Sequence, residues 1–143
     1  MLEKFAGNDT IALVVEDEET TRDLVTRLLT AMGAAEVLIA EEGSQALRLV
    51  CERHPHIVIS DVEMKPVDGL ALLGGIRGSM DPQVSSIPVV MFTSTQQGEV
   101  AKKAKDLGVN GFLVKPFNPK GFSTHIRDVL EKKSFLIPPG SKK

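Results

Sequence analysis

Five apolar segments of strand length recur along this chain, and a helical stretch follows each of them. Apolar runs that do not alternate strictly with polar residues are typical of strands buried on both faces of a parallel sheet. Parallel strands need crossover connections, which place helices on both faces of the sheet. We therefore predict an α/β fold with a five-stranded parallel sheet. The expected strands are Ile11 to Val15, Glu36 to Ala40, Ile57 to Ser60, Val89 to Thr93 and Gly111 to Val114.

Five helices are expected between and after these strands. The first has apolar residues at helical spacing from Leu24 to Met32, and the last has Asn118 as a cap and Pro119 in its first turn. The third helix has a cap candidate in Asp68, but two glycines lie inside it. Each glycine costs about 1 kcal/mol relative to alanine, so we expect this helix to be short or soft.

The length of 143 residues suits one domain. We expect it to span residues 10–133, with an N-terminal extension at 1–9 and a C-terminal tail at 134–143. The net charge of −2 and the lack of a block of basic residues argue against direct nucleic-acid binding. No run of about eighteen apolar residues is present, so we expect no membrane insertion and a cytoplasmic location.

The chain has a single cysteine, Cys51, which excludes an intrachain disulfide and a multi-cysteine zinc site. Cys51 shares an apolar helical stripe with Leu47 and Val50. This position predicts a buried structural thiol rather than a reactive one.

Acids, a hydroxyl group and a lysine stand where the predicted strands end. Glu16 and Asp17 follow the first strand, Asp61 follows the third, Thr93 ends the fourth and Lys115 follows the fifth. In open parallel sheets the ligand crevice lies at the carboxyl ends of the strands, where the strand order reverses. A strand order of 2-1-3-4-5 makes the first and third strands neighbours, which brings Asp17 beside Asp61.

Several carboxylates in one partly buried crevice repel one another unless a cation or a proton offsets their charge. Mg²⁺ fits such a site best, because it prefers oxygen ligands and takes one or two carboxylates together with water and phosphate oxygens. No histidine or cysteine stands at these strand ends, which argues against zinc. A single acid at a strand end is more often a turn or cap residue, so the prediction depends on the combination.

Four segments in this order and spacing closely resemble the receiver domains of two-component response regulators. The resemblance extends over about residues 10–132 and implies a flavodoxin-like fold with strand order 2-1-3-4-5. It also implies a phosphorylation-dependent signalling switch, not an enzyme with a separate substrate, similar to a stand-alone chemotaxis regulator. Pro66 and the pair Asp68-Gly69 follow the second segment as they do in the family. The four segments are Ile11 to Glu18, Ile57 to Asp61, Pro88 to Ser94 and Gly111 to Phe117.

The resemblance assigns a role to each residue of the predicted site. Asp61 would accept the phosphoryl group. Asp17 would bind Mg²⁺ directly, Glu16 would bind the metal or its waters, and the backbone carbonyl of Glu63 would complete the protein ligands with Asp61. Lys115 would pair with Asp61 at rest and with a phosphoryl oxygen afterwards.

Further family roles concern switching and phosphoryl lifetime. Thr93 would bond to another phosphoryl oxygen and move inward, and Phe112 would rotate with it or remain a fixed core residue. Glu63 and Thr95 would tune the lifetime of the phosphoryl group. The resemblance also implies a cis peptide bond between Lys115 and Pro116.

The implied partners are a sensor histidine kinase or a histidine phosphotransfer protein, and a downstream target. The target would bind a face made by the fourth helix, the fifth strand and the fifth helix. An adaptor and a phosphorelay intermediate remain open as roles, and so does a phosphorylation-independent binding module. A haloacid-dehalogenase-like phosphatase is disfavoured because Glu63, not aspartate, stands two residues after Asp61. A flavodoxin-like cofactor carrier is disfavoured because acids follow the first strand, where a flavin phosphate would bind.

Overall fold

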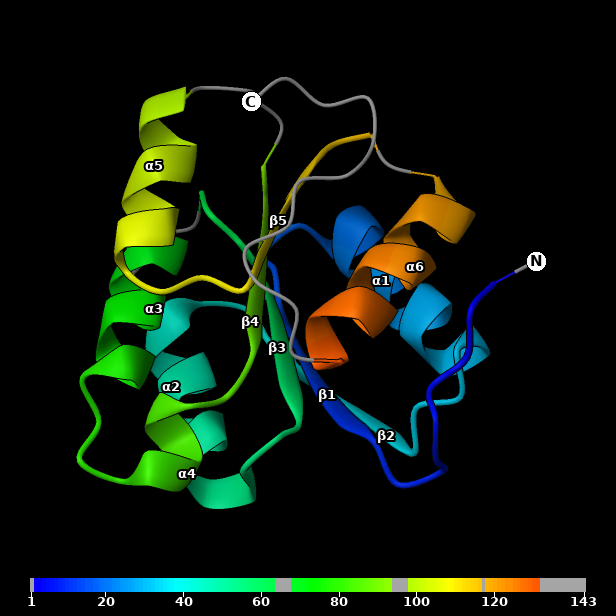
Figure 1. Cartoon of the computed structure of the whole chain (residues 1–143), viewed down its shortest axis with the longest axis horizontal. Helices are drawn as coiled ribbons and strands as arrows, with labels where there is room; N and C mark the ends of the chain where they lie inside the picture. Colours follow the sequence, from blue (N-terminus) through cyan, green and yellow to red (C-terminus); the bar gives the residue numbers. More distant parts are fainter. Residues whose placement is uncertain (1, 64–67, 94–97, 117, 132–143) are drawn as a thin grey trace.

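The computed structural model of the chain describes residues 2–63, 68–93, 98–116 and 118–131. Strands and helices alternate along the chain, with one additional short helix before the fourth strand (Figure 1). The elements are β1 (Ile11–Val15), α1 (Glu19–Ala31), β2 (Glu36–Ala40), α2 (Gly43–Arg53), β3 (Ile57–Asp61), α3 (Gly69–Arg77), α4 (Pro82–Ser85), β4 (Val89–Thr93), α5 (Gly98–Asp106), β5 (Gly111–Val114) and α6 (Pro119–Leu130).

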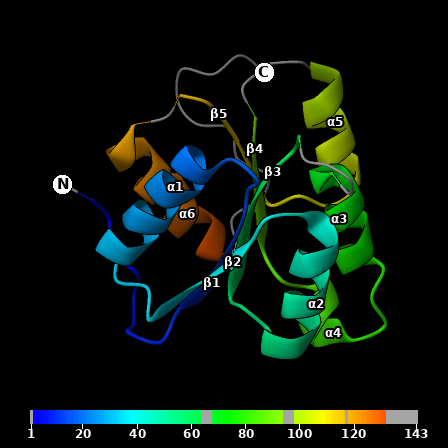
Figure 2. The ribbon, with the colours of Figure 1, turned by 180° about the vertical axis from the view of Figure 1, so that it is seen from behind.

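The five strands form one parallel sheet in the order β2-β1-β3-β4-β5, which confirms the predicted fold. Helices α1 and α6 cover one face of the sheet, and α2, α3, α4 and α5 lie on the other (Figures 1 and 2). Because β1 and β3 are neighbours, with Val15 opposite Ser60, the residues that follow them share one edge of the sheet. No helix in the described ranges has both the length and the apolar character needed to cross a membrane.

The structure differs from the predicted elements in one strand bound and in one additional helix. β3 extends one residue beyond the prediction and includes Asp61. The structure also contains α4, a sixth helix that was not expected. The side chain of Asp81 caps it by accepting the backbone N–H of Gln83, and Pro82 occupies its first turn. Four residues are too few to show a helical period, so only this cap signal marks the helix in the sequence.

Each face of the sheet carries its own hydrophobic core. The side of α1 and α6 includes Phe92 and Phe122, both fully buried, and the side of α2, α3 and α5 includes Met91 and Leu73. Helix α3 has nine residues, which agrees with the expected short helix. Gly75 lets it approach α2, because a Cβ there would lie only 3.3 Å from a methyl carbon of Leu47.

The prediction of a buried thiol at Cys51 is wrong, because Cys51 is exposed. Helix α2 buries Ala46 and Val50, and Leu47 is half-buried beside them. Cys51 stands one position after Val50, which turns it about 100° around the helix and out of the core. Leu24 at the start of the predicted stripe of α1 is likewise 46% exposed.

The N-terminal segment packs onto the domain. Phe5 is buried in the core between the sheet and helices α1 and α6, and its backbone N–H donates to the carbonyl of Met32 at 2.9 Å. The backbone N–H of Glu3 donates to Oγ of Ser123 at 3.0 Å, and its carboxylate lies 3.6 Å from Arg127. Residues 3–5 therefore connect the end of α1 with α6.

Candidate functional site

Three carboxylates meet at the carboxyl ends of β1 and β3. One carboxylate oxygen from each of Glu16, Asp17 and Asp61 lies within 4.8 Å of the other two. Glu16 and Asp61 are buried, with exposed fractions of 1% and 5%, whereas Asp17 is exposed. The pairing of β1 with β3 accounts for this proximity, as the sequence predicted.

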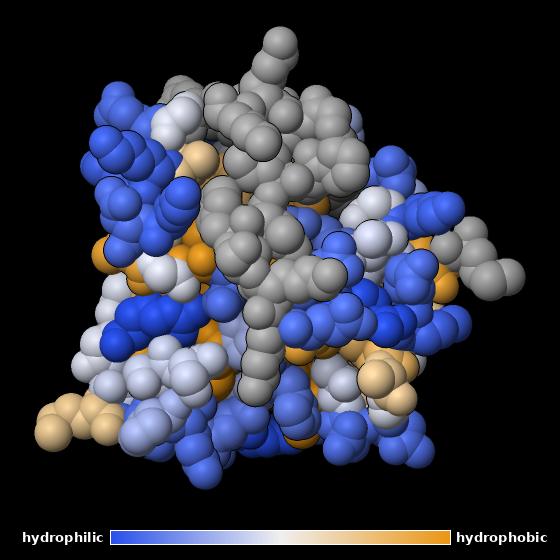
Figure 3. Space-filling view, in the orientation of Figure 1, coloured by the Kyte–Doolittle hydropathy of each residue, from blue (hydrophilic) through white to orange (hydrophobic). Residues whose placement is uncertain are grey.

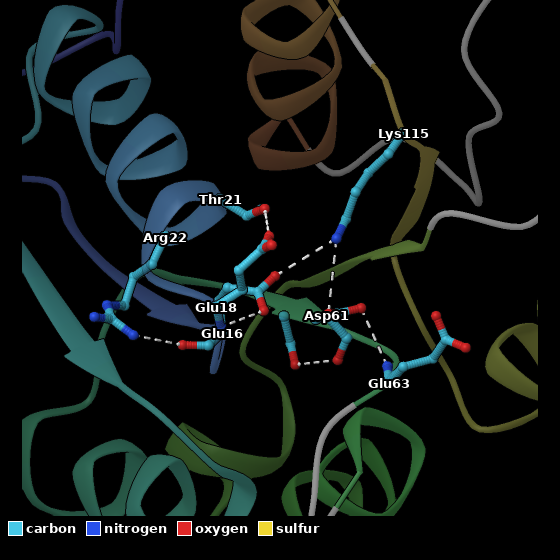
Figure 4. Close-up of polar contacts among 8 residues, drawn as sticks. Glu16, Glu18, Thr21, Arg22, Asp61, Glu63 and Lys115 are labelled. Carbon is cyan, nitrogen blue, oxygen red and sulfur yellow. Dashed lines mark hydrogen bonds and ion pairs between the residues drawn. The ribbon is translucent and has the colours of Figure 1, made fainter.

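The two carboxylate oxygens of Asp61 have different surroundings. Oδ1 accepts the backbone N–H of Glu63 at 3.1 Å, and Oδ2 lies 3.8 Å from Nζ of Lys115 (Figure 4). The backbone around Asp61 is held by the sheet, because the N–H of Val62 donates to the carbonyl of Phe92 at 3.0 Å. One oxygen is thus anchored by the backbone, and the other faces a cation.

Glu16 is a buried carboxylate with one unsatisfied oxygen. Oε2 accepts the backbone N–H of Glu18 at 2.9 Å. Oε1 has no hydrogen-bond partner among the described residues, and Nζ of Lys115 lies 3.6 Å from it. Burial raises the pKa of Glu16 to about 7 and also raises the pKa of Asp61. The buried carboxylates are therefore not fully stabilised by the protein's own groups, and an added cation would stabilise their negative charge.

Lys115 connects the acidic cluster to β4 and β5. Its Nζ lies nearly equidistant from Glu16 and Asp61, and it stands over the ring of Phe92, 5.0 Å from the centroid. Its backbone N–H donates to the carbonyl of Thr93 at 2.7 Å, and its peptide bond to Pro116 is cis. Thr93 is the last residue of β4 and is buried.

The residues present fit a hard divalent cation. All three clustered side chains offer carboxylate oxygens, the ligands that Mg²⁺ prefers. The unsatisfied Oε1 of Glu16 is a buried acceptor that such an ion would satisfy. Glu63 is exposed, and its side chain points away from Asp61 (Figure 4), which leaves its backbone as the group nearest the cluster.

Phe112 lies outside the acidic cluster. Phe112 is 4% exposed and pairs with Met91 across β4 and β5, so its ring is a core residue in this conformation. Thr95 falls outside the described residues, and so do Pro66 and the tail at 134–143.

Sequence reasoning missed two residues that contact the site. Phe92 is a buried residue of β4, and its ring lies below the ammonium group of Lys115. The backbone N–H of Glu18 holds the Glu16 carboxylate by donating to its Oε2. Neither contact has a sequence signal, because both depend on where the next strand or turn places a neighbouring side chain.

Comparison with known proteins identifies the family. The sequence profile of the response regulator receiver domain matches residues 12–127. The probable transcriptional regulator ycf27 of Galdieria sulphuraria is 35% identical over 122 residues, which are 84% of this chain and 45% of that protein. The probable chemotaxis protein CheY of Rhizobium etli is 31% identical over 105 residues, which are 73% of this chain and 80% of that protein.

Solved structures agree with these relatives. Chemotaxis protein CheY4 of Vibrio cholerae superimposes with a TM-score of 0.78 at 30% identity, covering 85% of this chain and 98% of that one. A putative response regulator from Chloroflexus aurantiacus has a TM-score of 0.80 at 26% identity, with coverages of 86% and 98%. The chain spans about half the length of the ycf27 regulators that it matches. It belongs to the response regulator receiver domain family, the signalling switches of two-component systems.

Proposed function

We propose that this chain is a phosphoacceptor switch in which Asp61 receives a phosphoryl group in the presence of Mg²⁺. The observation that carries the proposal is the unequal environment of the Asp61 carboxylate. Its Oδ1 is held by the N–H of Glu63, and its Oδ2 faces the ammonium group of Lys115. A carboxylate with one fixed oxygen and one oxygen directed at a cation is prepared to form a bond to phosphorus.

The donor would be a phosphorylated histidine on a sensor kinase or a phosphotransfer protein. An oxygen of Asp61 forms the new bond to phosphorus while the bond between phosphorus and the imidazole nitrogen breaks. The electron pair of that bond returns to the nitrogen, and the product is an acyl phosphate on Asp61. An ionised carboxylate needs no general base, so the remaining residues position and neutralise the phosphoryl group.

Residues around Asp61 supply these functions in the proposal. Mg²⁺, when bound, would offset the charge of the phosphoryl oxygens. Asp17 and Glu16 would hold it together with Asp61 and the carbonyl of Glu63. Lys115 would exchange its present carboxylate partners for a phosphoryl oxygen.

The conformational change would be transmitted from Thr93 to the surface of the domain. The hydroxyl of Thr93 would bond to a phosphoryl oxygen, and Phe112 on β5 would respond to that movement. The face of α5, β5 and α6 would then change its affinity for a target protein. The exposed surface of α5 is hydrophilic (Figure 3) and includes Lys102 and Lys103, so a target would meet charged groups on this helix.

The remaining assignments belong to the same proposal. The receiver domain would span residues 10–133 in the cytoplasm and act only on its own phosphorylation and dephosphorylation. Glu63 and Thr95 would tune the lifetime of the acyl phosphate. Its target would be a protein and not DNA, and both an adaptor and a phosphorelay role fit this chemistry.

Intact mass measurement tests the proposal directly. The full chain is incubated with acetyl phosphate and Mg²⁺, beside Asp61→Asn and a sample with a chelator. We expect one added phosphoryl group in the wild type, none in Asp61→Asn and none without the metal. Asp81→Asn is the matched control, since Asp81 caps α4 and lies 3.5 Å from His54 outside the acidic cluster, and asparagine is an equally good cap.

A negative result is made decisive by a second donor. If acetyl phosphate adds nothing, the experiment is repeated with a phosphorylated histidine phosphotransfer protein. No adduct from either donor would contradict the proposal and favour a phosphorylation-independent binding module on the same fold. An adduct that persists in Asp61→Asn would show that another residue is the acceptor.

A further inference from the structure

Helix α3 begins in direct contact with the backbone of the proposed phosphoacceptor. A Cβ on Gly69 would lie 2.2 Å from the backbone oxygen of Asp61 and 3.0 Å from Cα of Val62. It would also lie 2.6 Å from Cε of Met91. Ordinary contacts of a Cβ begin at 3.4 Å, so any side chain at Gly69 requires a displacement of at least about 1 Å.

The backbone of Asp61 is poorly able to make that displacement. β3 lies between β1 and β4, and the N–H of Val62 donates to the carbonyl of Phe92 at 3.0 Å. The carbonyl oxygen of Asp61 also accepts the buried hydroxyl of Ser60 at 2.9 Å. Moving Asp61 would break bonds in the centre of the sheet.

The start of α3 is tied to the residues that orient the Asp61 carboxylate. The N–H of Gly69 donates to the carbonyl of Val62 at 2.9 Å. The next residue, Glu63, donates its own N–H to Oδ1 of Asp61. If α3 moved away from β3, it would pull on Val62 and on the hydrogen bond that fixes Oδ1.

We propose that Gly69 is a positioning residue for the phosphoacceptor. Its bare Cα lets the first turn of α3 rest against Asp61, and this contact keeps the Glu63 N–H on Oδ1 while Oδ2 faces Lys115. The inference rests on the proposed function, because it assigns a further residue to the same site. A misplacement of about 1 Å at a reacting group can reduce a rate about 100-fold, so the effect on phosphorylation is expected to be large.

A purely structural role for Gly69 makes a different prediction. The Cε atom of Met91 is the flexible end of a side chain, and crowding there would lower stability without turning the Asp61 carboxylate. Met91→Val removes that methyl group and leaves the contact with the Asp61 backbone unchanged. Gly74 provides the matched control, since it lies in the same helix and a Cβ there meets nothing within 4 Å.

The experiment compares Gly69→Ala with Gly74→Ala, each in the wild-type chain and in Met91→Val. All measurements are made well below the unfolding temperature of each variant and are expressed per folded molecule. The first readout is the amide resonance of Glu63, which reports its bond to Oδ1 without metal or donor. The second is the dissociation constant for Mg²⁺, and the third is the rate of phosphorylation by acetyl phosphate.

We expect Gly69→Ala to shift the Glu63 amide resonance, to weaken Mg²⁺ binding and to slow phosphorylation at least about tenfold in both backgrounds. Gly74→Ala should leave all three readouts unchanged. Wild-type readouts in Gly69→Ala, or their full restoration by Met91→Val, would overturn the inference and leave the proposed function intact. If the wild type itself gains no phosphoryl group, the proposed function fails, and the Glu63 resonance and Mg²⁺ binding still decide the role of Gly69.

Discussion

The Nη2 atom of Arg77 donates to Oδ1 of Asn110 at 2.6 Å, and the same oxygen accepts the backbone N–H of Val89 at 2.8 Å. Arg77 ends α3, while Val89 and Asn110 stand at the starts of β4 and β5. The guanidinium group thus ties three elements together at the end of α3 that lies away from the acidic site. Its other hydrogen bonds go to the backbone carbonyls of Ser85, Ile87 and Gly108.

Arg77→Lys should lower the free energy of unfolding by about 2–3 kcal/mol, because one ammonium group cannot reproduce the planar donor fork and leaves carbonyls unpaired. Urea unfolding measures the change, and Arg48→Lys on the exposed face of α2 should alter it by less than about 0.5 kcal/mol. Equal stability of the two variants would contradict a structural role for the guanidinium group.

Mg²⁺ binding should weaken as the pH falls through 7. Burial raises the pKa of Glu16 to about 7, so the metal must displace a proton below that pH. One proton with that pKa predicts a dissociation constant about tenfold higher at pH 6 than at pH 8. Titration calorimetry in two buffers measures the affinity and the proton release, and Glu16→Gln should lose most of the dependence. An affinity that is constant from pH 6 to 8 would refute the expectation.

His125 should make the protein less stable in acid. Burial lowers the pKa of His125 to about 4, with Asp128 opposing the shift, and its Nε2 has no hydrogen-bond partner among the described residues. Because the unfolded state binds a proton at higher pH, the stability contribution is complete above about pH 6.5 and is lost toward pH 4. The loss amounts to about 3 kcal/mol.

Urea unfolding at pH 7, 5.5 and 4.5 isolates this effect. Glu16 acts in the opposite direction, since a raised carboxyl pKa adds stability as the pH falls from 7. The comparison is therefore between the wild type and His125→Leu, whose difference should change steadily with pH. His54→Asn serves as control, because His54 is exposed and asparagine tolerates its left-handed backbone, with φ of 47°. The same pH profile for His125→Leu and the wild type would exclude His125 as the cause.

Phe5→Ala should destabilise the protein by about 3–5 kcal/mol, as for a large side chain removed from a core. Phe5→Leu should cost less than about 1.5 kcal/mol, and Leu24→Ala on the exposed side of α1 should change little. Thermal and urea unfolding give the values. A loss for Phe5→Ala no greater than for Leu24→Ala would mean that residues 3–5 add nothing to the core.

The sheet could be predicted because four of its strands, β1, β3, β4 and β5, are buried along nearly their whole length and appear in the sequence as continuous apolar runs. The strand order and the acids at the strand ends were then sufficient to predict the acidic cluster. Contacts that depend on side-chain reach could not be predicted in this way. The ion pair of Lys115 with Glu16 is one, because it does not follow from the strand order and the family resemblance implied only the pair of Lys115 with Asp61.

Other features were missed because their signals are weak or absent. Phe5 lies before the first strand, and nothing in its neighbours indicates that it folds back onto α1 and α6. The close approach of Gly69 to Asp61 was also missed. The sequence shows only a glycine after the cap residue Asp68, and the three-dimensional contact reveals why a side chain would not fit there.

The exposure of Cys51 makes this chain convenient for spectroscopy. It is the sole thiol, it lies on the outer side of α2, and the chain has no tryptophan or tyrosine. A thiol-reactive fluorophore or spin probe would attach at one known position of the natural sequence, without engineered cysteines and without a competing protein signal. Since α2 packs against α3, such a probe would stand one helix away from the turn that begins beside Asp61.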